Sequence, residues 1–393
     1  MMRAWQWWMC GLLASAACGY PSLPPIVDHA GDAGSNVPDA GVGDAGAGEE
    51  VAQFAFTPAH LQAAQLPATV HDVTITGDTT INTSALLIGG RGDLHFVQQG
   101  AYAVLYAGAF TLNAHVTITG SLPLIIVATK TLRVSGNMDL GAVGPLSGPG
   151  AVSTGNGGDG IAARPDISGL FDLSGGGGGG HGAVGATGGT ADVNVSAPGS
   201  AGGAYSNAQL VGGSSGGSGG RVVGGDHAAP GGGGGGALEL SSQMEIFVGD
   251  VAINAGGGGG GGGVGNAAGG GGGAGGEIML EAPTMAIEGF VAANGGGGGG
   301  GSSANGTTPG TAGSDGTASL DLTAGGMLGD PDGGYGGPGA GGNAEPDAGG
   351  SARHAGGGGG SAGVIELRYR AATPPMLTGA HFTPAAKIDT TLP

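Results

Sequence analysis

The chain is poor in cysteine and in positive charge. Of its 393 residues two are cysteine, Cys10 and Cys18, and ten are lysine or arginine, against 29 that are aspartate or glutamate. The formal net charge is −19, and no basic patch is available to neutralise phosphates, which excludes nucleic acid as a partner. Binding to an anionic membrane surface through protein charge is disfavoured for the same reason. We interpret the acidity as a source of solubility for a chain whose surface is otherwise neutral.

Tryptophan is confined to the N-terminus, where Trp5, Trp7 and Trp8 lie in an apolar stretch. This stretch, residues 4–17, follows Arg3 and ends in small side chains, which together make the three parts of a secretory signal. A membrane-spanning helix needs roughly 20 apolar residues, and the stretch is shorter than that. We therefore predict that residues 1–17 are a signal peptide and that the protein is exported.

The end of the signal decides how the protein is anchored. Ser15-Ala16-Ala17-Cys18 resembles a bacterial lipobox, in which the cysteine is diacylated and becomes the new N-terminus, although Ser15 stands where leucine is usual. The resemblance implies lipidation at Cys18, a membrane as partner through the lipid anchor, and a location in the cell envelope, at the outer membrane or cell surface. Acyl chains contribute about 0.8 kcal/mol per buried methylene, so two or three hold a protein on a membrane. Ordinary cleavage after Ala17 also fits the small residues and would give a secreted protein.

Residues 18–50 carry little that can be buried. They are rich in proline, alanine, glycine and aspartate, with Asp-Ala-Gly copies beginning at Asp32, Asp39 and Asp44. Steady negative charge and few apolar groups predict a disordered acidic tether behind the lipidated cysteine. Short Asp-Ala-Gly repeats after a lipobox resemble those of myxobacterial surface lipoproteins. Because Cys10 leaves with the signal, the mature protein has no intrachain disulfide.

Strand signals appear between residues 51 and 173. The pentad Val-Thr-Ile-Thr-Gly begins at Val73 and again at Val116, and it alternates apolar and hydroxyl residues as a half-buried strand does. Residues 124–127 form a continuous apolar run, which indicates a strand covered on both faces. We interpret residues 51–173 as the β-rich N-terminal part of a larger β fold.

From residue 174 to 370, β-like segments alternate with polyglycine at a period of about 40 residues. The aligned segments are 238–240 with 278–280, 251–254 with 291–294, and 236–240 with 363–367, and a degenerate earlier copy aligns Val127 with Leu240. Repeats with two short strands each cannot bury a face alone and must stack on their neighbours. The sequence therefore predicts an all-β chain, a right-handed parallel β-helix or β-solenoid, followed by a C-terminal tail at 371–393.

Glycine supplies 100 residues and proline 21, a level that without a three-residue period is typical of low-complexity chain. Ordering one glycine costs roughly 1–2 kcal/mol of backbone entropy, and a backbone hydrogen bond returns only about 0.5–1.5 kcal/mol. Runs on successive turns could lie side by side as extended helices of three residues per turn, with every N–H and C=O paired. The alternatives are flexible loops along one flank, or a disordered glycine region with only residues 51–173 folded.

Segments of the form L-x-L…V-x-G-x-V-x-A-N followed by glycine runs resemble glycine-rich cell-surface proteins of myxobacteria over residues 110–369. In composition the chain is also similar to the PGRS class of mycobacterial surface proteins. The resemblance implies a surface or adhesive component. We expect a non-enzymatic lipoprotein with a structural or adhesive role, whose further partners are extracellular polysaccharide or other surface proteins. The alternative is a β-helix that binds or cleaves polysaccharide, because parallel β-helices often handle sugars.

Several short motifs look catalytic or metal-binding but have simpler explanations. Ser215 and Ser218 satisfy G-x-S-x-G, yet no helical pattern follows them as a nucleophile elbow requires. The nine histidines show no metal-ligand spacing. Arg91-Gly92-Asp93, a tripeptide read by animal integrins, is interpreted as a chance turn.

Aspartate–glycine pairs are interpreted in the same way. Asp159, Asp315 and the segment 330–333 contain such pairs, which favour turns and lack the remaining ligands of a calcium loop. We predict no catalytic residue, no metal site and no cofactor, which leaves Cys18 as the residue with an assigned chemical role.

Overall fold

The computed structural model describes residues 42–44, 50–161, 171–191, 197–206, 208–222 and 228–393. All of them belong to one compact unit, 39–393. Among them the helical element is a single 3-10 turn, η1 (Ala63–Gln65), and the rest are strands and extended segments. The predicted signal peptide, Cys18 and most of the predicted tether lie outside the described residues.

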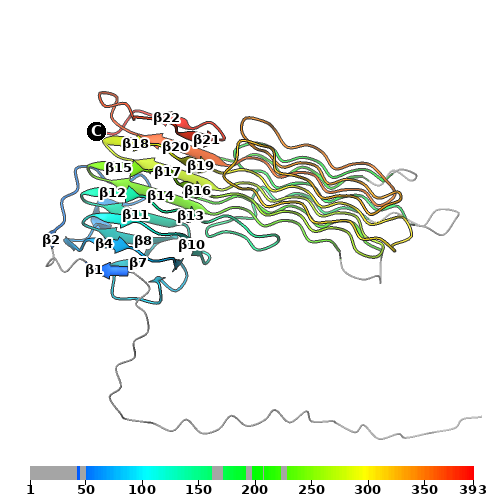
Figure 1. The fold of residues 1–393 in the computed structure, drawn as a ribbon, viewed down its shortest axis with the longest axis horizontal. Coiled ribbons are helices and arrows are strands. Elements are labelled where there is room, and N and C mark those ends of the chain that lie inside the picture. Colours follow the sequence, from blue (N-terminus) through cyan, green and yellow to red (C-terminus); the bar gives the residue numbers. More distant parts are fainter. Residues whose placement is uncertain (1–41, 45–49, 162–170, 192–196, 207, 223–227) are drawn as a thin grey trace, which may run out of the picture. The chain divides into compact units, whose positions relative to one another are not determined.

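Three sheets of mostly parallel strands wind around an apolar interior (Figure 1). In each turn the chain passes from sheet 1 to sheet 2 to sheet 3, as in β11 (Leu124–Ala128), β12 (Thr131–Val134) and β13 (Met138–Asp139). Successive turns pair in parallel, so the predicted all-β parallel solenoid is confirmed.

Each sheet contains one strand from almost every turn, and neighbouring strands are hydrogen-bonded in the following order. Sheet 1 consists of β7 (Phe96–Gln99), β8 (Tyr102–Ala107), β11, β14 (Ala237–Ser242), β17 (Glu277–Glu281), β20 (Val364–Arg368) and β22 (Lys387–Asp389). Sheet 2 consists of β1 (Val42–Asp44), β4 (Val73–Ile75), β9 (Phe110–Leu112), β12, β15 (Glu245–Val248) and β18 (Thr284–Ile287). Sheet 3 consists of β6 (Leu87–Ile88), β5 (Thr79–Asn82), β10 (Val116–Thr119), β13, β16 (Ala252–Asn254), β19 (Phe290–Ala292) and β21 (His381–Thr383). A separate pair joins β2 (Glu50–Val51) and β3 (Thr69–Val70).

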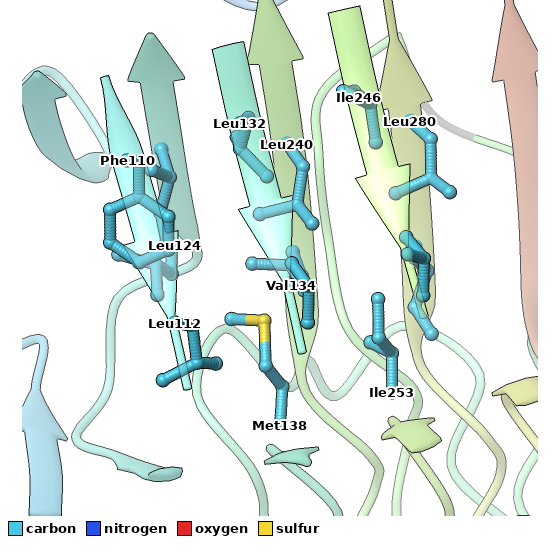
Figure 2. Close-up of a cluster of buried hydrophobic side chains, with 14 of the residues drawn as sticks. Phe110, Leu112, Leu124, Leu132, Val134, Met138, Leu240, Ile246, Ile253 and Leu280 are labelled. Carbon is cyan, nitrogen blue, oxygen red and sulfur yellow. The ribbon is translucent and has the colours of Figure 1, made fainter. Parts of the chain in front are cut away.

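Side chains that point inward form ladders from one turn to the next. Leu124 pairs with Leu238, Leu238 with Ile278, and Ile278 with Ile365, and all four are buried. Figure 2 shows how side chains of β9, β12 and β14 meet in this interior. In β10 and β12 buried and exposed residues alternate, because the outer face of those sheets meets solvent. Every residue of β11 is buried, which confirms that the apolar run at 124–127 is covered on both faces.

The predicted period of 40 holds in sheet 1 and drifts in the other sheets. Every pair between β14 and β17 keeps this offset, as Leu238 and Ile278 do. In sheet 3, Ile253 pairs with Val291 and not with Ala293, so the sequence alignment was wrong there. The turn that contains β17, β18 and β19 is one residue shorter at each of two corners than the turn that contains β14, β15 and β16. The register therefore moves by one residue in sheet 2 and by two in sheet 3.

Two other sequence matches do not become stacked pairs. Leu240 pairs with Ile126, one residue before the Val127 of the alignment. A slip of one residue would turn an interior side chain to the outer face. The observed pairing instead buries both Leu240 and Ile126 in the core. The pentads at Val73 and Val116 lie in different sheets, because β4 belongs to sheet 2 and β10 to sheet 3.

Strands at both ends extend the solenoid beyond the predicted boundaries. At the N-terminal end β1, β6 and β7 pair antiparallel with β4, β5 and β8. β1 and the first residue of β2 fall within 18–50, so the last part of the predicted tether contains paired strand. At the other end, residues assigned to a tail from 371 onward form β21 on β19 and β22 on β20. These residues therefore add strands to the solenoid.

Polyglycine leaves the solenoid at one corner. Between sheet 3 and sheet 1, only residues 120–123 connect β10 to β11, whereas the same corner of later turns opens into residues 140–236, 255–276 and 293–363. The described parts of these three insertions are the glycine bundle, a set of extended runs that lie side by side (Figure 1). Packed runs, one of the predicted arrangements, are therefore found in place of flexible loops or a disordered region.

Candidate functional site

Hydrogen bonds in the glycine bundle repeat every three residues. In run 267–276 successive N–H groups donate to three different neighbouring runs in turn, over distances of 2.8–3.0 Å. Ala268, Gly271 and Ala274 donate to carbonyls of 214–220, Gly269, Gly272 and Gly275 to those of 355–361, and Gly270, Gly273 and Gly276 to those of 255–261. Three further runs, 175–180, 229–236 and 293–303, donate to carbonyls of 267–276. A helix of three residues per turn produces this pattern, because each residue faces a direction about 120° from the last.

Close packing explains why the interior positions are glycine. A Cβ at Gly272 would lie 2.0 Å from the carbonyl oxygen of Gly296, and one at Gly178 would lie 1.9 Å from that of Gly359. The glycine hydrogen in this position points at the carbonyl oxygen, which gives a Cα–H···O contact worth about 0.5–1 kcal/mol. This contact adds to the N–H···O bond and offsets the entropy of ordering glycine, which one hydrogen bond alone does not.

Runs at the margin of the bundle keep glycine at every third position only. In run 310–316, Gly310, Gly313 and Gly316 face the neighbouring run 293–303, where a Cβ would lie 2.2–2.6 Å from a carbonyl oxygen. Between them, Thr311 and Ser314 are exposed. Outward side chains of this kind block the approach of another backbone, as charged or proline residues do on an edge strand. The margin thus ends the lattice, the network of hydrogen-bonded runs that makes up the bundle.

Two of the aspartates predicted to lie in turns have another role. Asp315 Oδ1 accepts hydrogen bonds from Gly144 N–H at 2.8 Å and from Gly259 N–H at 2.7 Å. Asp159 Oδ1 accepts one from Ser218 N–H at 2.7 Å. These carboxylates replace a carbonyl acceptor where the lattice has no further run, so the turn interpretation was wrong for both. Asp332 does lie in a turn, with a φ of 66°.

The other sequence motifs occupy structural positions. Ser215 and Ser218 lie in the extended run 213–220, where their N–H groups donate to Asn156 and Asp159 side chains. Arg91 and Asp93, the charged ends of the integrin-like tripeptide, are bonded to each other, with 3.0 Å between Nε and Oδ1. Within the described ranges no group of three or more His, Cys, Asp or Glu side chains is placed to hold a metal ion.

Sequence reasoning missed a buried carboxylate cluster on the outer face of sheet 1. Glu239 of β14 and Glu281 of β17 are fully buried, and Glu277 of β17 lies in the same face. Residues 52–68, which we call the strap, cover this face between β2 and β3. His60 of the strap places its Nδ1 2.5 Å from Glu239 Oε2, and Arg368 of β20 pairs with Glu281. The acidity was interpreted only as a source of solubility, and the spacing Glu-x-x-x-Glu in β17 was the available signal.

Burial and neighbouring charge perturb these groups strongly. Burial raises the pKa of Glu277 to about 7. Burial and the adjacent Glu239 carboxylate raise the pKa of Glu281, against the opposing effect of Arg368. Burial alone would lower the pKa of His60, but the hydrogen bond to Glu239 and the nearby carboxylates hold it above its ordinary value. The cluster therefore gains or loses protons near neutral pH.

A shallow hollow with hydroxyl groups lies in the part of the bundle formed by the first insertion. It has a volume of about 540 Å³ and is lined mainly by small polar residues. The lining residues are Ser147, Ala151, Val152, Ser153, Thr154, Asn156 and Ser215.

Comparisons with known proteins give no relative. No protein-family model, no curated protein and no solved structure matches the chain. Among the residues that the structure describes, no helix has the length and apolar character needed to span a bilayer.

Proposed function

We propose that the protein is a non-enzymatic cell-surface lipoprotein with a structural or adhesive role. The observation that carries the proposal is the glycine bundle, in which each interior run is bonded to runs on all sides. Such a lattice places backbone where a binding or catalytic domain would place side chains. It resists bending because every run is tied to several neighbours, and it is anchored at one corner of a side-chain-packed solenoid.

The margin of the bundle supplies the adhesive surface in this proposal. Outward positions there carry small, hydroxyl or apolar side chains, among them the exposed Leu322, Met327 and Tyr335. Exposed apolar side chains on a rigid support lose little entropy when they contact a partner. The proposed partners are extracellular polysaccharide or other surface proteins.

Cells that display the protein test this role. We expect Gly272→Ala, which forces a Cβ against Gly296, to lose adhesion to neighbouring cells or to matrix. Gly203→Ala is the matched control, because a Cβ there meets nothing within 4 Å. Equal adhesion by both variants, at equal surface amounts, would refute an adhesive role for the bundle.

Anchoring through Cys18 is a separate part of the proposal. Replacing Cys18 with alanine should move the protein from the membrane fraction to the soluble fraction, because the acyl chains are lost. Metabolic labelling with a fatty-acid analogue gives a second readout. A Cys18→Ala protein that stays with membranes would contradict lipidation at this residue.

Polysaccharide binding is the second candidate function, and the hydroxyl-lined hollow favours it. Hydroxyl and amide groups of Ser153, Thr154 and Asn156 line the hollow and can exchange hydrogen bonds with sugar hydroxyls. A glycan array with the wild-type protein and with the double variant Ser153→Ala/Thr154→Ala tests it. Binding that the double variant abolishes supports this function, and binding that it leaves unchanged places any sugar site elsewhere.

A further inference from the structure

The strap is closed at its base and held at its tip by different kinds of contact. At the base, β2 and β3 pair antiparallel, and Ala52 N–H donates to Ala68 O at 2.9 Å. Phe54 and Leu66, and Leu61 next to the tip, pack on apolar side chains of sheet 1. The strap is thus held at its base by backbone pairing of β2 and β3, and apolar contacts add to it.

At the tip, sheet 1 holds the strap through side chains. Phe56 N–H donates to Gln243 Oε1 at 3.0 Å, and Ala59 N–H donates to Glu281 Oε2 at 3.2 Å. His60 is bonded to Glu239 at 2.5 Å, with the imidazole largely and the carboxylate fully buried. Two of these three contacts use carboxylates. The attachment of the tip to sheet 1 therefore depends on the charge of these carboxylates and on the charge of His60.

The charges that face His60 are mostly negative. Glu239 comes from β14, and Glu277 and Glu281 come from β17, while the Tyr102 ring of β8 lies 6.0 Å from the imidazole. Glu239 Oε1 is buried without a hydrogen-bond partner among the described residues. A buried carboxylate with one free oxygen depends strongly on its remaining partner, which is His60.

Besides His60, the positive charges near the cluster come from β20 and β22, which lie on the side of β17 away from β14. Arg368 of β20 pairs with Glu281 and also lies 3.3 Å from Asp389 of β22, so it is shared between two carboxylates. Lys387 of β22 and Glu366 of β20 both lie close enough to act on Glu277. When His60 is neutral, this shared guanidinium and Lys387 are left to balance the buried carboxylates.

We infer that the strap is a pH-dependent latch, closed while His60 is protonated on Glu239 and released when His60 loses its proton. Release uncovers the outer face of sheet 1, with the carboxylates of the cluster and the apolar side chains of Val104, Tyr106 and Ile125. The fold provides the hinge, since the β2–β3 pair holds the base while the tip moves.

The direction of the pH effect follows from the proton affinities. The pKa values of His60, Glu277 and Glu281 are all higher in the closed state than for the free side chains. The closed state therefore binds more protons than the open state. Its stability is greatest below about pH 4.5, where all three groups are protonated in both states, and is lost as the pH rises through about 7.

Hydrogen exchange of the full-length chain tests the latch, with protection factors that correct for the pH dependence of intrinsic exchange. We expect the Phe56 and Ala59 amides, which are bonded to sheet 1 at the tip, to lose protection by about tenfold or more between about pH 5.5 and about pH 8.5. β11 serves as the internal reference and should keep its protection, because its side chains are apolar. Constant protection of the tip, or parallel loss in β11, would overturn the proposal.

Three variants separate the latch from a merely structural contact. His60→Gln should leave the tip weakly protected at both pH values. Glu239→Gln should keep more protection than wild type at the higher pH, because the buried carboxylate bonded to His60 no longer needs a positive partner. His115→Gln is the control, since His115 contacts Thr117 on the solenoid and not the strap. A wild-type pH response in His60→Gln, or the full wild-type loss of protection at high pH in Glu239→Gln, would overturn the proposal.

Discussion

The solenoid and the glycine bundle solve the same packing problem in opposite ways. In the solenoid, large side chains such as Leu124 and Leu238 fill the space between sheets, and hydrophobic burial provides the main stabilisation. In the bundle, neighbouring runs approach so closely that a single methyl group does not fit at Gly272. Stabilisation there comes from N–H···O and Cα–H···O contacts summed over the whole lattice.

The two regions therefore tolerate opposite kinds of substitution. Removing atoms damages the solenoid because it leaves a cavity, whereas adding one atom damages the bundle because it separates the runs. The two regions also depend on one another. The bundle grows from the corner between sheet 3 and sheet 1, so the solenoid fixes the starting positions of its runs.

An added methyl group in the bundle interior should cause the greatest loss of stability. Gly272→Ala places a Cβ 2.0 Å from Gly296 O, against backbone that cannot change rotamer. We expect a loss of about 4–5 kcal/mol in the free energy of unfolding, at the upper end for single substitutions. Urea unfolding followed by circular dichroism measures it, and a loss below about 1 kcal/mol would show that the runs are not packed as described.

The matching test in the solenoid removes atoms from the core. Leu240 is fully buried and pairs with Ile126 and Leu280. Leu240→Ala should cost about 2–5 kcal/mol of unfolding free energy through lost burial and the cavity left behind. Leu322→Ala, at an exposed site, is the control and should stay within about 0.5 kcal/mol of wild type. Similar losses in both variants would remove the distinction between core and margin.

A more moderate loss is expected where a side chain completes the lattice. Asp315→Ala leaves the N–H groups of Gly144 and Gly259 without their acceptor, which should cost about 1.5–3 kcal/mol. Asp315→Asn keeps a carbonyl oxygen in place and should recover most of this loss. Thermal unfolding of both variants decides the point, and equal melting temperatures for alanine and asparagine would contradict the acceptor role.

A slight gain in stability is expected at an open glycine. Gly203 has nothing within 4 Å of a Cβ, so Gly203→Ala restricts the unfolded chain without a clash. We expect a stabilisation of about 0.4–1 kcal/mol, measured by the same urea titration. Destabilisation at this site would mean that glycine is required for a reason other than close packing.

Sequence patterns predicted the solenoid better than the bundle because side chains specify pairing. The Leu-x-Leu segment at 238–240 identified its partner at 278–280 and, by its echo at 363–367, the next strand of the same sheet, which pairs with β17. Glycine runs carry no such information, so the sequence left packed runs, flexible loops and disorder open and did not indicate which runs are neighbours. The Gly-x-x spacing of 310–316 was an available signal for a margin run, because a side chain is excluded by close backbone only at every third position.

The candidate site was largely beyond sequence reasoning for a related physical reason. Glu239 and Glu281 lie at outward positions of sheet 1, which normally meet solvent. The strap covers them in the folded chain, and its His60 lies far from both in the sequence. The roles of Asp159 and Asp315 depend in the same way on runs that the fold brings to them.

Amide exchange of the glycines in run 267–276 is the decisive measurement for the ordered lattice. If each N–H is bonded to a neighbouring run as described, these amides should exchange as slowly as those of β17, which follows them in the chain. Mass spectrometry on peptides from 267–276 and 277–281 compares the two within one sample. Exchange of the glycine peptides at the rate of an unfolded chain, beside a protected β17, would contradict the lattice.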